Sequence, residues 1–486
     1  MSLLLIIPVL IPIFAGIYIL KKNFDDRAAR EKFVSAAVII NAVIVILLSL
    51  VARDQELVLL PIIKGNPIAL KIDNLGAMFA SLVSVLWVLC IYYAFEYMKH
   101  EGDENRFFGF YTMTFGVMIG IIFASNLVTL YLFYEFLTLC TVPLVMHGDT
   151  IQANTAARIY IIFSIFGAAL ALGGTAMIAY AGDGTTTFVP GGFIPPLMAG
   201  TAILQVAFLF CFFGFGVKAA VMPFHAWLPC ASVAPTPVSA LLHAVAVVKA
   251  GVFAITRVVY FSIGPDLLRG TPAQTVALGV CIVTIVYGSA MALMSQHLKR
   301  RLAYSTVSQL SYILFGIVLM TPEGYIGGMV HMFGHAIVKI TLFLCAGAII
   351  YKTGREYVWE LKGMGKAMPI TMGVFTVASF ALVGIPPLPG FFSKWYLAVA
   401  AYSAGETNAL AFVGLVALGI SALLTAVYLF SICVNAYMPG AGFDYETANK
   451  DVSDPNKYMT VPLLILAVAI VMFGLLVGPM INILTL

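Results

Sequence analysis

Long, nearly uninterrupted apolar runs dominate this chain, and only short polar or Gly/Pro-rich stretches separate them. A membrane-spanning helix needs about 20 consecutive apolar residues, and most of the runs reach that length. Of the 486 residues, 62% are hydrophobic and 10% are charged, whereas roughly 25% of the residues in soluble domains are charged. The sequence therefore excludes a soluble globular domain, a disordered chain and a disulfide-stapled secreted module. It predicts an all-α polytopic membrane protein.

The apolar runs predict about 14 transmembrane helices. The first run has its basic cluster after it rather than before it, so we expect a true span and not a cleavable signal peptide. The expected spans are residues 3–20, 33–52, 74–98, 107–124, 126–146, 157–181, 200–221, 235–260, 274–296, 302–320, 325–350, 369–403, 408–438 and 458–484.

The basic residues predict the orientation of these spans. Of the 26 Lys and Arg residues, 17 lie on the loops of one side, four on the loops of the other side and five inside apolar runs. Loops rich in Lys and Arg stay in the cytoplasm, so the side that contains residues 21–32 is expected to be cytoplasmic. An even number of spans then places both termini on the outer side of the inner (plasma) membrane.

Five basic residues lie within the apolar runs. Arg257 is close to the end of its run and is expected to snorkel to the surface. The other four lie deep, and one acid, Glu135, shares their depth; these lysines are Lys218, Lys249, Lys339 and Lys394. A charge at mid-membrane costs roughly 3 kcal/mol on insertion scales. The alternative to a functional role is that each group pairs with a carbonyl or a neighbouring side chain and only pins helices together.

Histidines extend this polar set. His331, His335 and Lys339 are spaced by four residues, so they form one stripe along a helix that extends about 12 Å. Groups at that spacing can exchange protons through one or two waters. His225 and His243 lie close in sequence to Lys218 and Lys249, and we take them as supporting residues.

Prolines predict that two of the spans are broken. Pro223 and Pro229 follow Lys218, whereas Pro386 to Pro389 precede Lys394, and proline removes a backbone donor and disrupts a helix. Five spans separate the two sites, so the broken helices cross in opposite directions, as inverted repeats do. We expect three N-terminal helices, two five-helix repeats and a last helix, in residues 1–106, 107–260, 274–438 and 439–486. The alternative is kinked helices with no shared origin.

No sequence feature predicts a metal or redox cofactor. The seven cysteines are scattered and no pair has C-x-x-C spacing, so zinc or iron–sulfur ligation has no local support. Phosphate-binding and dinucleotide-binding glycine motifs are also absent from the sequence. We therefore expect the chain to bind neither a cofactor nor a metal.

The motifs around these residues resemble the antiporter-like membrane subunit shared by respiratory complex I, Mrp-type Na⁺/H⁺ antiporters and complex I-related membrane-bound hydrogenases. The resemblance covers about residues 70–440 and leans toward the Mrp D-type subunit, because Lys394 occupies a place where one complex I subunit has glutamate. The motifs are LYLFYEFLTLCTVPLV, KAAVMPFHAWLPCASVAPTPVSALLHAVAVVKAG, HLKRRLAYSTVSQLSY, HMFGHAIVKITLFLCAG, TGREYVWELKGMGKAMP and GIPPLPGFFSKW.

The resemblance implies fourteen helices with two inverted five-helix repeats, broken helices 7 and 12, and a proton relay through the membrane. In that relay Glu135 modulates Lys218, Lys249 connects onward, and Lys394 is the terminal group. The helix-eleven residues His331, His335 and Lys339 lie between them.

The function expected from these observations is proton translocation, with Na⁺/H⁺ antiport as a variant, in a complex I-like or Mrp-like energy-converting complex. The chain would then be the ion-pumping subunit of an oxidoreductase complex or of an antiporter. Its partners would be other membrane subunits, including further antiporter-like ones, lipid, and indirectly peripheral iron–sulfur subunits, but no nucleic acid. Two alternatives stay open: a stand-alone transporter for an organic substrate, and a quinone-binding membrane subunit.

Overall fold

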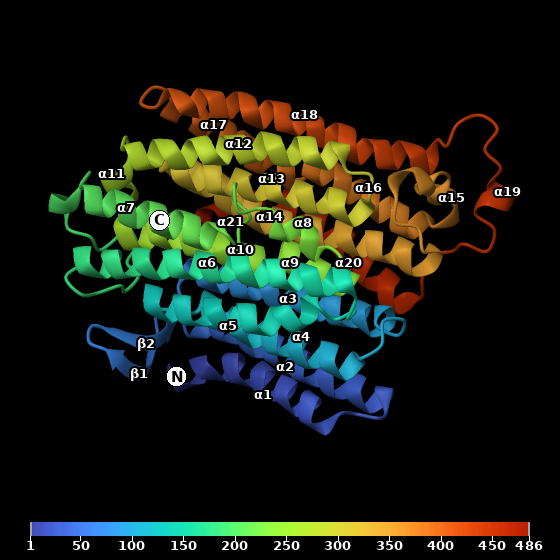
Figure 1. Ribbon diagram of the computed structural model, residues 1–486, viewed down its shortest axis with the longest axis horizontal. Coiled ribbons are helices and arrows are strands. Elements are labelled where there is room, and N and C mark those ends of the chain that lie inside the picture. Colours follow the sequence, from blue (N-terminus) through green and yellow to red (C-terminus); the bar gives the residue numbers. More distant parts are fainter. Residues whose placement is uncertain (1, 485–486) are drawn as a thin grey trace.

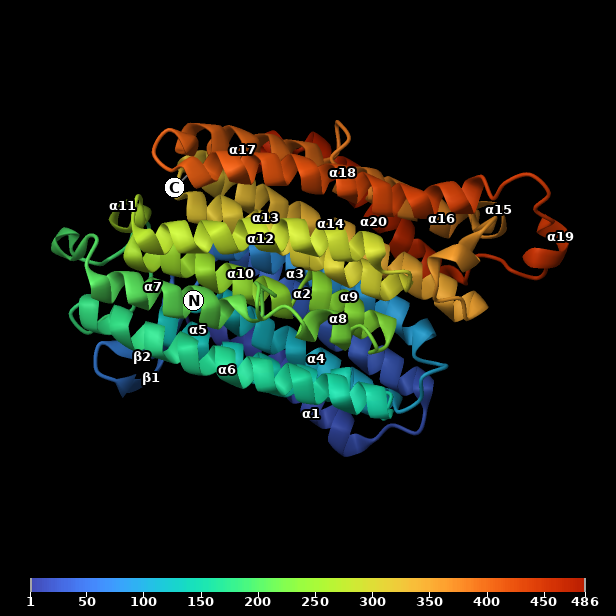
Figure 2. The ribbon, with the colours of Figure 1, turned by 45° about the horizontal axis from the view of Figure 1, so that its top comes forward.

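The computed structural model describes residues 2–484, apart from the side chains of residues 62, 446 and 447. Almost all helices run along one common direction, and the loops gather at the two ends of the bundle (Figures 1 and 2). Within the described residues, eleven helices are long and apolar enough to cross a membrane. The protein is thus a mostly helical, multi-pass membrane protein.

The N-terminal third contains four long helices. A short 3₁₀ turn, η1 (Ser2–Ile6), leads into the first of them; the four are α1 (Ile7–Lys22), α2 (Arg27–Val51), α3 (Asn74–Tyr97) and α4 (Glu104–Ile122). Asp26 caps α2 by accepting hydrogen bonds from the amides of Ala28 and Ala29, which satisfies donors that a helix start leaves free. Helices α1 and α4 pack closely because Gly16 and Gly109 have no side chains at their contact.

A β-hairpin interrupts this helical pattern, so the expectation of an all-α fold was wrong at one place. Strands β1 (Glu56–Ile63) and β2 (Asn66–Lys71) pair antiparallel, with Glu56 opposite Lys71. The segment is rich in β-branched residues and turns at Gly65, whose φ of +82° suits glycine. It forms part of the loops at the end of the bundle that also contains α11 (Figure 1).

The middle of the chain contains long helices followed by several short ones. They are α5 (Leu127–Val145), α6 (Ile151–Ala181), η2 (Pro196–Met198), α7 (Ala202–Gly216), α8 (Trp227–Ala231), α9 (Thr236–Ala244), α10 (Val247–Arg257), η3 (Val258–Ile263, a π-helix) and α11 (Pro265–Leu268). Residues 217–226 form turns between α7 and α8. The expected single span at 235–260 is interrupted between α9 and α10, which the sequence reasoning did not predict.

The last part of the chain is again mostly long helices. They are α12 (Pro272–Met294), α13 (Leu298–Leu319), α14 (Pro322–Thr353), η4 (Val358–Leu361), α15 (Met364–Ala367), α16 (Pro369–Val383), α17 (Pro389–Gly405), α18 (Ala409–Tyr437), α19 (Tyr445–Ala448), α20 (Lys457–Leu475) and α21 (Val477–Leu484). Helices α16 and α17 lie toward opposite ends of the bundle (Figures 1 and 2), and residues 384–388 separate them.

Helix α14 forms the centre of the bundle. Every residue from Tyr325 to Ile349, apart from the half-buried Ile326, is buried, and α14 packs against α9, α13, α16, α17 and α20. The polar stripe predicted on this helix is therefore surrounded by protein on all sides, where charges are weakly screened.

The prediction that Arg257 snorkels to the surface was wrong. Its side chain is buried, donates two hydrogen bonds to the carboxylate of Asp73 and lies over the rings of Phe253 and Phe261. Burial alone would raise the pKa of the Asp73 carboxyl, but the charge and hydrogen bonds of Arg257 outweigh it and lower that pKa. A carboxylate 184 residues away in sequence thus neutralises the buried guanidinium, whose Nε atom has no hydrogen-bond partner among the described residues.

Candidate functional site

The turns after α7 place Lys218 inside the protein. Helix α7 ends at Gly216, and Lys218 follows in a turn with a fully buried side chain. Its ammonium donates a hydrogen bond to the carbonyl of Tyr134 on α5 and lies 3.4 Å from the centre of the Tyr134 ring. A carbonyl and an aromatic face together replace part of the water that the ammonium has lost.

Glu135 is the next residue on α5. It is close enough to Lys218 to interact electrostatically, yet its Oε1 atom is buried and has no hydrogen-bond partner among the described residues. The carboxylate and the ammonium are therefore neighbours that are not joined by a hydrogen bond in this structure.

Lys249 lies on α10, just after the interruption that separates α9 from α10. Its Nζ atom is 2.5 Å from Nδ1 of His335 on α14, and both side chains are buried. Helix α10 approaches the turns around Lys218 closely at Gly251, where an added Cβ would lie 2.6 Å from the carbonyl oxygen of Phe215. The structure thus brings together Lys249 and His335, two residues that the sequence analysis selected separately.

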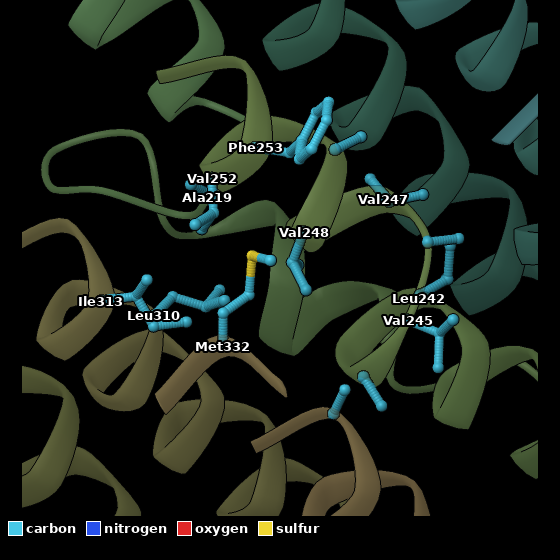
Figure 3. Close-up of a cluster of buried hydrophobic side chains, with 14 of the residues drawn as sticks. Ala219, Leu242, Val245, Val247, Val248, Val252, Phe253, Leu310, Ile313 and Met332 are labelled. Atoms are coloured by element: carbon cyan, nitrogen blue, oxygen red, sulfur yellow. The ribbon is translucent and has the colours of Figure 1, made fainter. Parts of the chain in front are cut away.

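A cluster of buried apolar side chains lies where α10, α13 and α14 meet (Figure 3). Figure 3 shows Val248 of α10 facing Met332 of α14, with Leu310 and Ile313 of α13 beside them. All of these side chains are buried. A proton on Lys249 or His335 can therefore leave only through polar neighbours or through waters between the helices.

His331 continues the row one helical turn from His335. The two rings lie 6.0 Å apart, and His331 Nδ1 is 2.8 Å from Ser393 Oγ of α17. On its other side His331 Nε2 donates to Gln309 Oε1 of α13 over 3.0 Å. The Ser393 hydroxyl, which has one proton, lies within hydrogen-bond distance of both Nδ1 and the Gly390 carbonyl. The space beside both histidines and Ser393 holds about one water molecule.

Lys394 is the neighbour of Ser393 in sequence and lies in the first turns of α17. Its ammonium donates to the carbonyls of Leu382 and Val383 over 2.8 and 2.6 Å. These carbonyls belong to the end of α16, where the helix dipole favours a positive charge. Lys394 is only partly buried, unlike the other three lysines.

Lys339 lies one further turn along α14 from His335. It donates to Ser305 Oγ over 2.7 Å, and Ser305 is 2.6 Å from the hydroxyl of Tyr428 on α18. The sequence reasoning did not select Ser305 or Tyr428, nor Gln309 beside His331. Ser305, Gln309 and Tyr312 recur at helical spacing along a membrane helix, and that polar stripe is a signal that could have revealed two of them.

The two supporting histidines have different surroundings. His243 is fully buried, lies flat against Phe343 at 4.6 Å, and has no partner for either ring nitrogen among the described residues. His225 lies in the turns before α8, with its ring 4.9 Å from that of Tyr287. The described contacts do not connect His225 to the other site residues.

Lys249, His335, His331 and Ser393 therefore form one row next to Lys394, with hydrogen-bond contacts at its two ends and stacked rings, 6.0 Å between centroids, in its middle. Within residues 2–484, apart from the three undescribed side chains, no hydrogen bond joins Lys218 to Glu135 or to Lys249. No group of three or more His, Cys, Asp or Glu in that part of the chain could hold a metal ion.

A helical membrane bundle with titratable groups aligned in its interior is the class of protein that this fold and site define. A family profile described as "NADH:quinone oxidoreductase/Mrp antiporter, TM" matches residues 124–421. A second, "NADH-Ubiquinone oxidoreductase (complex I), chain 5 N-terminus", matches residues 65–108. The chain belongs to the NADH:quinone oxidoreductase/Mrp antiporter family of membrane proteins.

Individual relatives agree with this assignment. The chain is 33% identical to NADH-quinone oxidoreductase subunit N of Desulforudis audaxviator, over 84% of this chain and 82% of the relative. It is 32% identical to subunit L of Mycobacterium tuberculosis, over 83% of this chain but only 62% of that longer protein. A solved chain of the Mrp complex from Dietzia sp. has the same fold, with a TM-score of 0.81, 23% identity and coverage of 100% of this chain and 97% of the other.

Proposed function

We propose that this protein translocates protons as a membrane subunit of a complex I-like or Mrp-like energy-converting assembly, where Na⁺/H⁺ antiport is the alternative form of transport. The row from Lys249 to Ser393 is the observation that carries the proposal, because titratable groups in direct contact occupy the buried centre of the bundle. The family supports the assignment, since its relatives are named as subunits of quinone oxidoreductases and antiporters. Its partners are accordingly other membrane subunits.

We propose that the chain crosses the membrane fourteen times. Three further crossings would join the eleven long apolar helices: α4, the pair α7 and α8, and the pair α16 and α17. In Figures 1 and 2, α16 and α17 lie toward opposite ends of the bundle, as the two halves of one broken helix would. Helices α7 and α16 start at opposite ends, which supports two inverted repeats in residues 107–260 and 274–438.

In the mechanism we propose, Glu135 controls whether Lys218 keeps its proton. Burial destabilises an ammonium group, and a nearby carboxylate stabilises it. The hydrogen bond of Lys218 to the Tyr134 carbonyl, together with a Glu135 Oε1 atom that has no partner among the described residues, supports a form in which the pair is separated. Lys218 would then release its proton toward Lys249, and the row on α14 would pass it to Lys394.

The energies involved are compatible with pumping. Moving one charge against 100 mV costs about 2.3 kcal/mol, so a membrane at ~150–200 mV requires roughly 4 kcal/mol per proton. Forming or breaking the interaction of a buried charge with a partner changes proton affinity by that order.

The first expected result concerns Glu135→Gln. Glutamine keeps the size and hydrogen bonding of the side chain but removes the negative charge, so proton flux through the assembled complex should fall several-fold. Flux is measured in vesicles that contain the complete complex, per assembled complex. Glu323→Gln on the first turn of α14 is the matched control and should transport normally; full flux in Glu135→Gln at normal abundance would show that Glu135 has no switch role.

The second expected result concerns orientation in the plasma membrane. We propose that the end of the bundle with residues 21–32, 297–305 and 353–366 faces the cytoplasm and that both termini face outward. In a variant without the half-buried Cys140 and Cys230, Thr353→Cys should react only with a membrane-permeant thiol reagent. Glu406→Cys, at the opposite end, should react with an impermeant reagent in intact cells. The reverse pattern would overturn the topology.

The stand-alone transporter is less well supported than the subunit role. The space beside His331 and His335 holds about one water molecule, which is too small for an organic substrate. Transport by the purified chain alone would favour that alternative, whereas co-purifying membrane subunits would favour the assembly. A quinone-binding role would instead require competition between a quinone analogue and activity of the complex.

A further inference from the structure

Lys339 has hydrogen-bond partners unlike those of the other buried lysines. Its ammonium contacts a chain of hydroxyl groups: Lys339 donates to Ser305, which is 2.6 Å from Tyr428. The Tyr428 hydroxyl donates to Thr425 Oγ1 over 3.3 Å, and the Thr425 hydroxyl donates to the carbonyl of Ser421 over 2.7 Å. All five residues are buried.

The direction of every hydrogen bond in this series of hydroxyl groups follows from counting the protons that each group can donate. Each hydroxyl has one proton to donate. Thr425 gives its proton to the Ser421 carbonyl, so it must accept from Tyr428. Tyr428 must then accept from Ser305, and Ser305 must accept from Lys339. All three hydroxyl groups therefore point away from the ammonium and present lone pairs toward it.

Arg301 fixes the position of Tyr428 relative to Ser305. The guanidinium donates to the Tyr428 carbonyl and to Ser431 Oγ, both over 3.0 Å, and to the Ser295 carbonyl over 2.7 Å. Arg301 and Ser305 are one turn apart on α13, so the same helix that presents Ser305 also holds the turn of α18 that carries Tyr428.

We infer that Ser305 and Tyr428 are positioning residues that stabilise the protonated form of Lys339 relative to its neutral form. This inference rests on the proposed proton relay. When Lys339 loses its proton, the neutral amine keeps two N–H groups and can still donate to Ser305, but the positive charge that strengthens this hydrogen bond is lost. The series of hydroxyl groups therefore stabilises the charged state of Lys339 more than the neutral state, because a charge-assisted hydrogen bond is roughly twice as strong as a neutral one. The series of hydroxyl groups ends at a backbone carbonyl, which cannot pass a proton on. It therefore adjusts the proton affinity of Lys339 and does not provide a second exit for protons.

Three other titratable groups interact electrostatically with Lys339: Lys249 of α10, His243 of α9 and His335 of α14. All three are unchanged in the variants below, and the test is the pH dependence of proton flux through the reconstituted complete complex. Ser305→Ala should shift the pH of half-maximal flux to lower values by about one unit, the scale on which one charge-assisted hydrogen bond displaces a proton equilibrium. The shift is acidic because a less stabilised ammonium releases its proton at lower pH. Tyr428→Phe should shift the profile in the same direction, and Thr425→Val should shift it least.

Two variants serve as controls. Ser311→Ala removes a buried hydroxyl from α13, the helix that also contains Ser305, and Tyr111→Phe removes one from α4; neither hydroxyl touches Lys339, Ser305 or Tyr428. Both should keep the original pH profile. An equal shift in Ser311→Ala, or an unchanged profile in assembled Ser305→Ala and Tyr428→Phe, would overturn the inference. If one of the three test variants does not assemble, the other two decide.

A separate variant distinguishes this inference from the relay itself. Lys339→Ala should lower flux at every pH if the relay passes through α14. Normal flux in Lys339→Ala would contradict the proposed function. Low flux in Lys339→Ala together with an unshifted profile in Ser305→Ala would contradict only the positioning role.

Discussion

Replacing Lys394 with alanine is expected to abolish proton translocation or to reduce it by at least about tenfold, because a positioned proton-transfer group contributes a factor of roughly 10²–10⁴ to a rate. Lys394 is the one partly exposed lysine of the four, and it lies at the break between α16 and α17. A terminal group must exchange protons with one bulk phase, and unwound backbone at membrane depth is tolerated where it lines a wet cavity. Lys394 follows Ser393, the partner of His331, and is therefore the group that we expect to take the proton onward from the row.

The measurement is ion flux per assembled complex, because Lys394 also holds two carbonyls at the end of α16. Loss of those bonds could lower abundance without affecting transport. Lys394→Glu should keep partial function, since a carboxylate can exchange protons at the same place. Lys362→Ala, a change to an exposed lysine on the loop before α15, should behave like the unchanged protein. Normal flux per complex in Lys394→Ala would contradict the terminal role.

The sequence predicted the helical membrane architecture well because apolar length is a local property. The runs at 274–296 and 325–350, for example, correspond to α12 and α14 within a few residues at each end. The interruption between α9 and α10 was missed because residues 243–247 include neither proline nor glycine. The close approach of Gly251 to Phe215 and Ala219 depends on packing between separate helices, which a local pattern does not encode.

The sequence predicted which residues belong to the candidate site but not the contacts between them. Four lysines and the His331 stripe stand out because charges are costly in a membrane. Their partners are distant in sequence: Lys249 meets His335 across 86 residues, and Lys218 meets a backbone carbonyl 84 residues away. A carbonyl has no sequence signature, so the contact of Lys218 with Tyr134 required the structure. The hairpin β1–β2 was missed for a simpler reason, because it lies between the expected spans 33–52 and 74–98 and was treated as a connecting loop.

A charge-preserving substitution at Lys249 separates a proton carrier from a structural cation. Arginine keeps the positive charge and the hydrogen bonding toward His335 but holds its proton under all physiological conditions. Lys249→Arg should therefore assemble in normal amounts and transport at least about tenfold more slowly. Histidine releases and binds protons near neutral pH, so Lys249→His should keep a measurable part of the flux although it is shorter.

Which of these two variants transports protons faster decides whether Lys249 is a proton carrier or a structural cation. If Lys249 carries protons, the flux of Lys249→His must exceed that of Lys249→Arg, because only histidine can pass the proton on to His335 Nδ1. A purely structural role requires the opposite order, since arginine replaces the charge and the length of lysine better than histidine does. Flux per assembled complex, measured in vesicles at one pH, decides between them, and Lys352→Arg at the exposed end of α14 controls for the substitution itself. Normal transport by Lys249→Arg would remove the central link between Lys218 and α14, and with it the proposed path through the membrane.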